Sequence, residues 1–451
     1  MSERRQFRAI KGTRDILPPD SALWNWFERT AREVFESYGF HEVRLPIFEE
    51  TELFARSIGA DTDVVGKEMY TFLDPPGDID PLGRLQEKSF RSMAKLSDLL
   101  PRDVISLRPE GTASVCRAYI EHGMHTRPGN VKLYYVGPMF RRERPQKGRY
   151  RQFHQVGAEV LGPSDAPAID AEVLEMLLVL FRRVGLRNTK LYVNSIGCKE
   201  CRTNYVELLR EELRKVHDNL GPDSRRRIET NPLRVLDSKL PDEQPIIETL
   251  PRISDHLCAD CREHFAKLKD ELKLRGIAYE ENWRLVRGLD YYTRTTFEVT
   301  AAGLGSQNAV CGGGRYDGLV ELLGGPPTKG IGFAIGTDRA ILSIQEGGNL
   351  PKLPGLAVYV AWMGTKTYPT AVSITRKLRD GGLAVELPPE EMKFKKSLGL
   401  ADKLGARYAL IIGEDEVASG NYTLKRLADA DQRKFNENDL LEYLESERRG
   451  G

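Results

Sequence analysis

The residue types of greatest chemical interest lie in two polar stretches of the chain. Residues 287–295, with the sequence RGLDYYTRT, place two arginines, a carboxylate and two tyrosines in what the local pattern predicts to be a strand hairpin reaching Val299. Residues 140–151 hold six basic side chains and one acid, Glu143. Guanidinium groups fixed on strands bind phosphate through paired hydrogen bonds. Together the two stretches predict a pocket that binds a polyphosphate and a small polar molecule.

Some of these residues also have structural explanations. A charge run is often a solvated hairpin tip, and for residues 140–151 alone this explanation and a binding site remain open. Glu110, between a proline and a glycine, is able to hold an ammonium group, cap a helix or form a surface ion pair. The segments 312–318 and 330–339 place glycines beside arginines but match neither GxxxxGK[ST] nor a GxGxxG motif in a βαβ context. Two common nucleotide-binding motifs are thereby excluded.

Hydrophobic spacing indicates the elements that must position these residues. An amphipathic pattern predicts a helix over 21–38, and a strand-like run over 42–46 carries Pro46, which favours a sheet edge or an interface. The other predicted elements are a loop over 74–86, strands over 133–141 and 150–160, a buried helix over 172–183 and a glycine-rich turn over 312–314. The two strands form a hairpin whose loop is the basic segment, so Arg141 and Glu143 share one strand face.

The length of 451 residues predicts two or three domains. Charge-dense helical patterns with proline breaks predict an insertion over 199–275. Residues 352–355 have the composition of a linker. Beyond them, strands and helices alternate over 357–413 as in a small βαβ domain. The predicted boundaries are 1–198 and 276–348 for one domain in two parts, 199–275 for a helical insertion and 349–451 for a C-terminal domain.

Net charge, hydropathy and cysteine content indicate the compartment of the protein and a possible metal site. A formal charge of +1 gives no global attraction for a polyanion. The sequence shows no apolar leader and no stretch of roughly 20 apolar residues, so we expect a cytoplasmic protein without a membrane partner. Two CxxC pairs, Cys198 with Cys201 and Cys258 with Cys261, are separated by 56 residues. The spacing within each pair is typical of tetrathiolate zinc sites, but the long gap leaves a structural zinc and four reduced thiols both open.

Seven motifs, taken in chain order, resemble the histidyl-tRNA synthetase family of class II aminoacyl-tRNA synthetases. They are KGTRD (11–15), RLP (44–46), RPEGT (108–112), GPMFR (137–141), RGLDYY (287–292), GRYDG (314–318) and the segment from GFA to Arg339 (332–339). The resemblance covers nearly the whole chain. It implies an α+β fold with a class II antiparallel sheet and flanking helices, a helical insertion, a C-terminal α/β anticodon-binding domain, and a homodimer whose interface uses the Pro46 segment.

The resemblance also implies a reaction and a role for individual residues. Histidine is activated with ATP and Mg²⁺ to an adenylate, pyrophosphate leaves, and histidine is transferred to the 3′ end of tRNA(His). Arg287 and Arg141 would be catalytic. ATP would be bound by Arg141, Glu143, Phe153 and Arg339. Histidine would be bound by Glu110, Thr112, Gln155, Glu159, Arg287, Tyr291, Tyr292 and Tyr316. Arg144 and Gln146 would contact the tRNA acceptor end.

One motif departs from the family pattern, and two other functions compete with the resemblance. Thr337 and Asp338 precede Arg339 where the family more often has a Leu-Glu pair, so altered phosphate or metal geometry is expected there. A non-catalytic synthetase paralogue that regulates ATP phosphoribosyltransferase typically lacks the C-terminal domain and active-site arginines, which this chain has. An adenylating enzyme with a different acceptor is the other alternative. The synthetase hypothesis requires Arg141, Arg287 and Arg339 to converge on one pocket.

Overall fold

The protein is described by a computed structural model covering residues 6–59, 62–73, 104–301, 308–348, 350–351, 353 and 355–449. The chain divides into two compact units, Met1–Pro351 and Lys352–Gly451. The loop predicted over 74–86 lies outside the described residues, as do two positions of the predicted linker.

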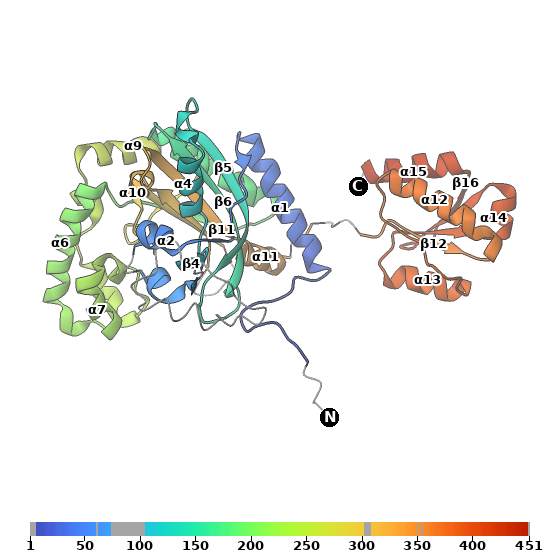
Figure 1. The fold of residues 1–451 in the computed structure, drawn as a ribbon, viewed down its shortest axis with the longest axis horizontal. Coiled ribbons are helices and arrows are strands. Elements are labelled where there is room, and N and C mark those ends of the chain that lie inside the picture. Colours follow the sequence, from blue (N-terminus) through green and yellow to red (C-terminus); the bar gives the residue numbers. More distant parts are fainter. Residues whose placement is uncertain are drawn as a thin grey trace, which may run out of the picture. The chain divides into compact units, whose positions relative to one another are not determined.

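An eight-stranded sheet is the centre of the first unit (Figure 1), with the order β1-β5-β6-β11-β10-β9-β7-β8. Its strands are β1 (His41–Glu42), β5 (Val131–Phe140), β6 (Gln152–Gly162), β7 (Lys190–Ser195), β8 (Glu280–Glu281), β9 (Thr293–Thr300), β10 (Ala309–Arg315) and β11 (Lys329–Gly336). Every neighbouring pair is antiparallel except the two outermost, β1 with β5 and β7 with β8. The predicted hairpin is confirmed as β5 and β6, and its loop holds the basic segment.

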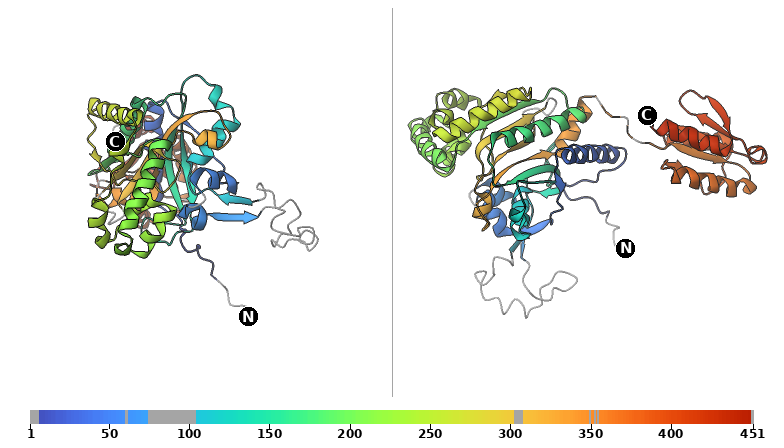
Figure 2. Two further views of the ribbon diagram at one scale, coloured as in Figure 1. Left: turned by 90° about the vertical axis from the view of Figure 1, so that its left-hand side faces the viewer. Right: turned by 90° about the horizontal axis from the view of Figure 1, so that it is seen from above.

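Helices pack against this sheet (Figure 2). Helix α1 (Asp20–Ser37) buries Leu23, Phe27, Ala31 and Val34, whose spacing of three and four residues places them on one helix face. It contacts α5 (Pro167–Arg183) and α11 (Thr337–Glu346), and α5 contacts α9 (Ala259–Leu274). Beside the sheet, α2 (Thr51–Ile58) contacts α4 (Thr112–Glu121), α10 (Leu319–Leu322) and a small sheet. This small sheet has the order β2 (Phe48–Glu50), β4 (Val104–Leu107) and β3 (Tyr70–Leu73).

Residues between β7 and β8 form a mainly helical region whose buried side chains belong to one hydrophobic cluster with residues of α4, β5 and β6. Its α-helices are α6 (Lys199–Lys215), α7 (Pro222–Thr230), α8 (Gln244–Glu248) and α9. Tyr205, Leu209 and Leu213 of α6 follow one another at four-residue spacing and are buried. The apolar face of α6 therefore packs inward although the helix as a whole is strongly charged.

The second unit is a five-stranded sheet with helices. Its strand order is β13 (Val385–Glu386), β12 (Val358–Trp362), β14 (Tyr408–Ile412), β15 (Tyr422–Arg426) and β16 (Gln432–Phe435). The helices are α12 (Tyr368–Asp380), α13 (Phe394–Lys403), α14 (Glu414–Ser419) and α15 (Glu437–Arg449). The strands and helices predicted over 357–413 are confirmed. The antiparallel strands β15 and β16 and the helices α14 and α15 extend this pattern beyond the prediction.

Three local predictions were wrong. The segment 287–299 is not a hairpin, because only β9 is a strand and its partners are β7 and β10, which are distant in sequence. The triplet 312–314 is not a turn but lies inside β10, between β9 and β11. The run over 42–46 contributes only Glu42 to the two-residue strand β1, and Pro46, which has no N–H to donate, lies beyond the end of that strand.

Candidate active site

A cavity of about 330 Å³ opens beside β6, β10 and β11, and it collects most of the residues expected to bind ligands. Arg141, Arg287 and Arg339 all line it, although they lie on three distant parts of the chain. The other expected residues along its wall are Glu110, Thr112, Glu143, Phe153, Gln155, Tyr291, Tyr292 and Tyr316. The required convergence of the three guanidinium groups is therefore present.

Each arginine is held in place by a neighbouring acceptor. Nε of Arg141 donates to the carbonyl oxygen of Pro109 at 3.0 Å. An Nη of Arg287 donates to Glu298 at 2.8 Å, and an Nη of Arg339 donates to the carbonyl oxygen of Ala309, also at 2.8 Å. Groups fixed in this way stabilise a developing negative charge without first having to reorganise.

The arginine side of the cavity carries excess positive charge. Burial, followed by repulsion from the nearby Arg149, lowers the pKa of Arg339 below its ordinary value. Nε of Arg287 is buried and has no hydrogen-bond acceptor among the described residues. The guanidinium carbon of Arg141 lies 5.4 Å from the ring centroid of Phe153. A polyanion with an aromatic base matches this combination of cations and ring.

Two buried carboxylates, Glu110 and Glu159, give the opposite side of the site a different character. Glu110 accepts backbone N–H bonds at the start of α4, from Thr112 at 2.7 Å and Ala113 at 2.9 Å. The helix-capping interpretation of Glu110 thus describes its contacts, yet the same side chain lines the cavity. Burial raises its pKa.

Glu159 lies behind the cavity wall and anchors two of the expected residues. It accepts a hydrogen bond from the Thr112 hydroxyl at 2.7 Å and one from the Tyr316 hydroxyl at 2.6 Å. Burial raises the pKa of Glu159 to about 8. On the same strand, Oε1 of Gln155 is buried without a donor among the described residues and lines the cavity. Acidic oxygens and an unused amide oxygen are suitable partners for the N–H groups of a small cationic or heterocyclic ligand.

Glycines allow these side chains to occupy the strand surface. A Cβ on Gly312 would lie 2.5 Å from Nη1 of Arg287, and one on Gly332 would lie 2.5 Å from the carboxyl carbon of Glu159. The close approach of a charged side chain to the backbone therefore requires glycine at both positions. Sequence reasoning noticed these glycines but assigned the first to a turn; the strand pattern on either side was the signal that it missed.

Asp338, the departure from the family pattern, takes part in a structural contact. Its Oδ1 accepts a hydrogen bond from Arg14 at 2.8 Å, and its Oδ2 accepts one from the backbone N–H of His154 at 2.9 Å. Asp338 therefore joins the N-terminal segment and β6 to the start of α11. Arg14 in the KGTRD motif was the sequence signal for this contact, but no partner for it was predicted.

Arg144 and Gln146 lie apart from the cavity wall. Both are exposed in the loop of the β5–β6 hairpin, where Gln146 forms an isolated backbone bridge with Arg149. The basic segment is therefore divided in function: Arg141 and Arg149 line the cavity while its tip faces solvent.

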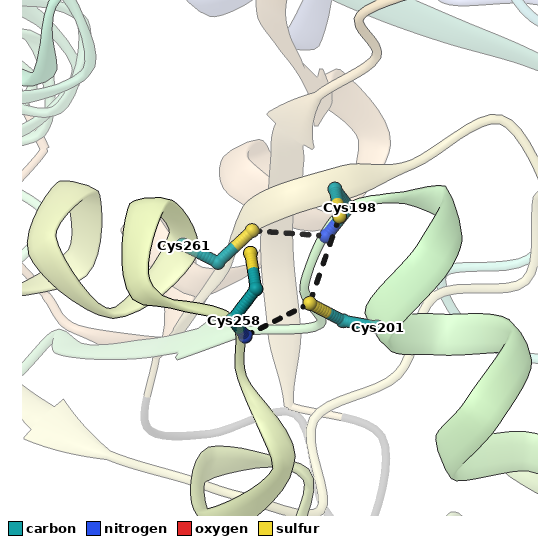
Figure 3. A group of neighbouring side chains, drawn as sticks. All are labelled: Cys198, Cys201, Cys258 and Cys261. Carbon is teal, nitrogen blue, oxygen red and sulfur yellow. Dashed lines mark hydrogen bonds between the residues drawn. The ribbon is translucent and has the colours of Figure 1, made fainter.

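The four cysteines of the CxxC pairs also converge, at a place separate from the cavity lining (Figure 3). One sulfur from each of Cys198, Cys201, Cys258 and Cys261 lies within 4.8 Å of all the others. All six cysteines of the chain are free thiols. The helices of the described residues include none long and apolar enough to cross a membrane.

An antiparallel sheet with flanking helices, and a cavity lined by three arginines and the buried acid Glu110, form the arrangement expected of a class II aminoacyl-tRNA synthetase. The histidyl-tRNA synthetase family model matches residues 70–340, and an anticodon-binding domain model matches residues 357–447. The chain belongs to the histidyl-tRNA synthetase family, as the motifs predicted.

Relatives and solved structures agree with this assignment. A histidine–tRNA ligase of Koribacter versatilis is 51% identical over 97% of this chain and 96% of its own length, and one of Solibacter usitatus is 49% identical over 97% and 99%. The crystal structure of apo histidyl-tRNA synthetase from S. aureus is 35% identical, with a TM-score of 0.76 over 98% of this chain and 100% of that one. A structure from Bacillus halodurans, titled as an ATP phosphoribosyltransferase regulatory subunit/histidyl-tRNA synthetase, is 18% identical with a TM-score of 0.60, which shows a shared fold.

Proposed function

We propose that this chain is a histidine–tRNA ligase that forms histidyl-adenylate from histidine and ATP and transfers histidine to the 3′ end of tRNA(His). The observation that carries the proposal is the convergence of Arg141, Arg287 and Arg339 in one cavity that also contains buried carboxylates. The compartment that this function implies is the cytoplasm, where tRNA is charged for protein synthesis.

ATP occupies the arginine side of the cavity in this proposal. Arg141 binds the α-phosphate, Arg339 binds the γ-phosphate, and Phe153 stacks on adenine. Glu143 lies between Arg149, at 3.2 Å, and Arg141, at 3.8 Å, and lines the cavity. Its carboxylate has the oxygen ligands that Mg²⁺ prefers, so it is placed to meet the metal that accompanies ATP as substrate.

Histidine occupies the side with the buried acids. Glu110 and Glu159 are the carboxylates of this subsite, with Thr112, Gln155 and the hydroxyls of Tyr292 and Tyr316 as further polar partners. Tyr291 is a further histidine-binding residue on the cavity wall: its hydroxyl lies 3.4 Å from Glu110, and its ring centroid lies 4.7 Å from that of Tyr292. A site built to pair polar groups rejects apolar amino acids, because its own groups would then remain unpaired.

The first reaction step needs positioning and charge stabilisation more than proton transfer. A carboxylate oxygen of histidine attacks the α-phosphorus of ATP, the bond to the β-phosphate oxygen breaks, and pyrophosphate leaves. Negative charge concentrates on the α-phosphoryl oxygens during this step. Arg141 and Arg287 stabilise that charge from two sides.

In the second step the 3′ ribose hydroxyl of tRNA attacks the histidyl carbonyl carbon and AMP leaves. A phosphate oxygen of the adenylate takes the hydroxyl proton. Arg144 and Gln146, on the exposed hairpin loop, contact the acceptor end of tRNA(His), and the unit that contains residues 357–447 binds the anticodon. Residues 355–451 hold 15 basic and 15 acidic side chains, so this binding must depend on local patches and not on net charge.

We also propose a homodimer that uses the segment around Pro46. Ile47, Phe48, Phe72 and Leu73 are apolar, lie in or beside the small sheet and are 44–58% exposed in the single chain. Contiguous apolar side chains on a surface commonly mark an interface between subunits. Sedimentation velocity tests this: the wild type should sediment as a dimer and Phe48→Glu should shift toward the monomer. A monomeric wild type would contradict the proposal.

ATP–pyrophosphate exchange with histidine, followed by charging of tRNA(His), tests the catalytic proposal. Arg141→Met, Arg287→Met and Arg339→Met should each lower the exchange rate by about 10²- to 10³-fold, the usual effect of removing one preorganised donor. Arg226→Met is the matched control, because this arginine is exposed on α7, pairs with Asp223 and does not line the cavity formed by the described residues. Absence of exchange in the wild type would favour the regulatory paralogue, and exchange without charging would favour an enzyme with another acceptor.

A further inference from the structure

The two CxxC pairs form a compact sulfur cluster between the beginnings of two helices. Cys198 and Cys201 lie at the start of α6, and Cys258 and Cys261 lie at the start of α9 (Figure 3). The four sulfurs are within 4.8 Å of one another, and those of Cys198 and Cys201 are 3.6 Å apart. Tetrahedral zinc with Zn–S bonds of about 2.3 Å requires sulfurs about 3.8 Å apart. The cluster therefore has the dimensions of a closed four-thiolate zinc site.

Backbone hydrogen bonds to sulfur link the two turns reciprocally. The N–H of Cys198 donates to Sγ of Cys261 at 3.2 Å, and the N–H of Cys258 donates to Sγ of Cys201 at 3.1 Å. A neutral thiol is a weak acceptor, whereas a metal-bound thiolate is stabilised by such outer hydrogen bonds. Four thiolates and no open position are typical of structural zinc.

The first cysteine turn directly holds a part of the chain that lines the cavity. Arg202, the residue after Cys201, donates to the carbonyl oxygens of Asp290 at 3.0 Å and Tyr292 at 2.7 Å. The N–H of Arg294 donates to the carbonyl oxygen of Gly197 at 2.7 Å. The main chain is thus fastened to this turn on both sides of Tyr292, a residue of the cavity wall.

We propose that Cys198, Cys201, Cys258 and Cys261 bind one structural zinc ion, which fixes the turn 197–202 so that Arg202 positions the backbone of residues 290–292 at the histidine subsite. The ion joins the two ends of the helical region to each other and, through Arg202, to the cavity. Arg202 is a positioning residue in this arrangement, since its guanidinium reaches the backbone and not the ligand. The positioning role rests on the proposed function; the metal site does not.

Metal analysis of the full-length chain tests the site. Protein expressed with zinc and iron both available, and purified without chelators, should contain about one zinc ion per chain by mass spectrometry. Expression with cobalt should give thiolate-to-cobalt charge-transfer bands. Cys201→Ala should lose the metal, while Cys116→Ala, the control at a buried thiol outside the cluster, should retain it. A wild-type chain without zinc, with iron in its place, or with disulfides between these cysteines would overturn the metal proposal.

Kinetics of a variant that keeps its zinc tests the positioning role. Arg202→Met should retain the metal but raise KM for histidine by about tenfold or more, the usual consequence of losing a charged hydrogen-bond donor. KM for ATP should stay near the wild-type value, because Arg141 and Arg339 are held by other segments. Arg202→Lys, which keeps a charged donor, should restore part of the affinity for histidine.

The possible failures of this experiment are distinguishable. Zinc-loaded Arg202→Met with the wild-type KM for histidine would overturn the positioning role alone. Zinc-loaded wild type that performs no histidine-dependent exchange would contradict the proposed function, and the positioning role with it, while the metal content would still decide the zinc site.

Discussion

The triplet Gly312-Gly313-Gly314 allows the proposed catalytic role of the Arg287 guanidinium to be tested without changing any charge. Successive residues of a strand face opposite sides of the sheet, so Gly312 faces the cavity and Gly313 faces the packed side. A Cβ on Gly312 would lie 2.5 Å from Nη1 of Arg287, where ordinary contact begins at 3.4 Å. Gly312→Ala must therefore displace the guanidinium by about 1 Å, a misplacement that can lower a rate by about 10²-fold.

We expect Gly312→Ala to lower kcat of ATP–pyrophosphate exchange by about 100-fold, equivalent to about 2.7 kcal/mol in the activation free energy. Its thermal midpoint should stay near that of the wild type, because the end of a side chain can move aside. Gly313→Ala should behave in the opposite way. Its Cβ would lie 2.6 Å from Cζ of Phe297 and 2.7 Å from Cβ of Phe333, so overpacking should lower the free energy of unfolding by about 1–3 kcal/mol.

Exchange kinetics and thermal unfolding of both variants decide the question. Gly399→Ala is the control, since no atom of the described residues, apart from its chain neighbours and the backbone of α13, lies within 4 Å of its Cβ position, and it should leave the kinetics unchanged. Wild-type kcat in Gly312→Ala, or a loss of stability equal to that of Gly313→Ala, would refute the assignment of Arg287 as a guanidinium whose position limits the rate.

Three further predictions concern ionisable groups. Because burial raises the pKa of Glu159 to about 8, the native state retains a proton that the unfolded state releases at the lower pKa of an ordinary glutamate. Stability of the ligand-free enzyme should therefore fall as pH rises between these two pKa values and level off above about 8, and thermal unfolding should show a flatter profile in Glu159→Gln. Asp338→Ala leaves the N–H of His154 unpaired and should lower the free energy of unfolding by about 1–3 kcal/mol in urea titrations, whereas an unchanged value would contradict the joining role of Asp338. Arg315 is fully buried against Asp170 and Asp317, so Arg315→Met should destabilise the fold by about 3–5 kcal/mol, and a loss below 1 kcal/mol by calorimetry would contradict that pairing.

Much of the local structure could be predicted because it depends on short-range patterns. The helix expected over 21–38 is α1, and the hairpin expected around the basic loop is β5 and β6. The errors fall where a segment depends on distant partners. β9 lies between β7 and β10, so the failed hairpin could not be corrected from neighbouring residues. The failed turn differs, because the strand pattern on either side of Gly312 was present in the sequence, although the approach of Arg287 to that glycine was not.

The candidate site divides in the same way. The motifs identified the family and indicated residues that the structure brings to one cavity, because side-chain chemistry and spacing are properties of the sequence itself. The contacts of Asp338 with Arg14 and His154, and of Arg202 with the backbone of Tyr292, were not predicted. Each joins segments far apart in the chain, so only the packed structure reveals it.

The amino-acid sequence by itself determined which groups this protein has available: guanidinium side chains for phosphate, acids for a small polar ligand, and two pairs of thiols. The tertiary structure alone decided that Arg141, Arg287 and Arg339 share one cavity and that four sulfurs lie within 4.8 Å. The physical reason is that sheet order and burial fix the distances between groups that are distant in the chain, and those distances set the strength of every interaction between them.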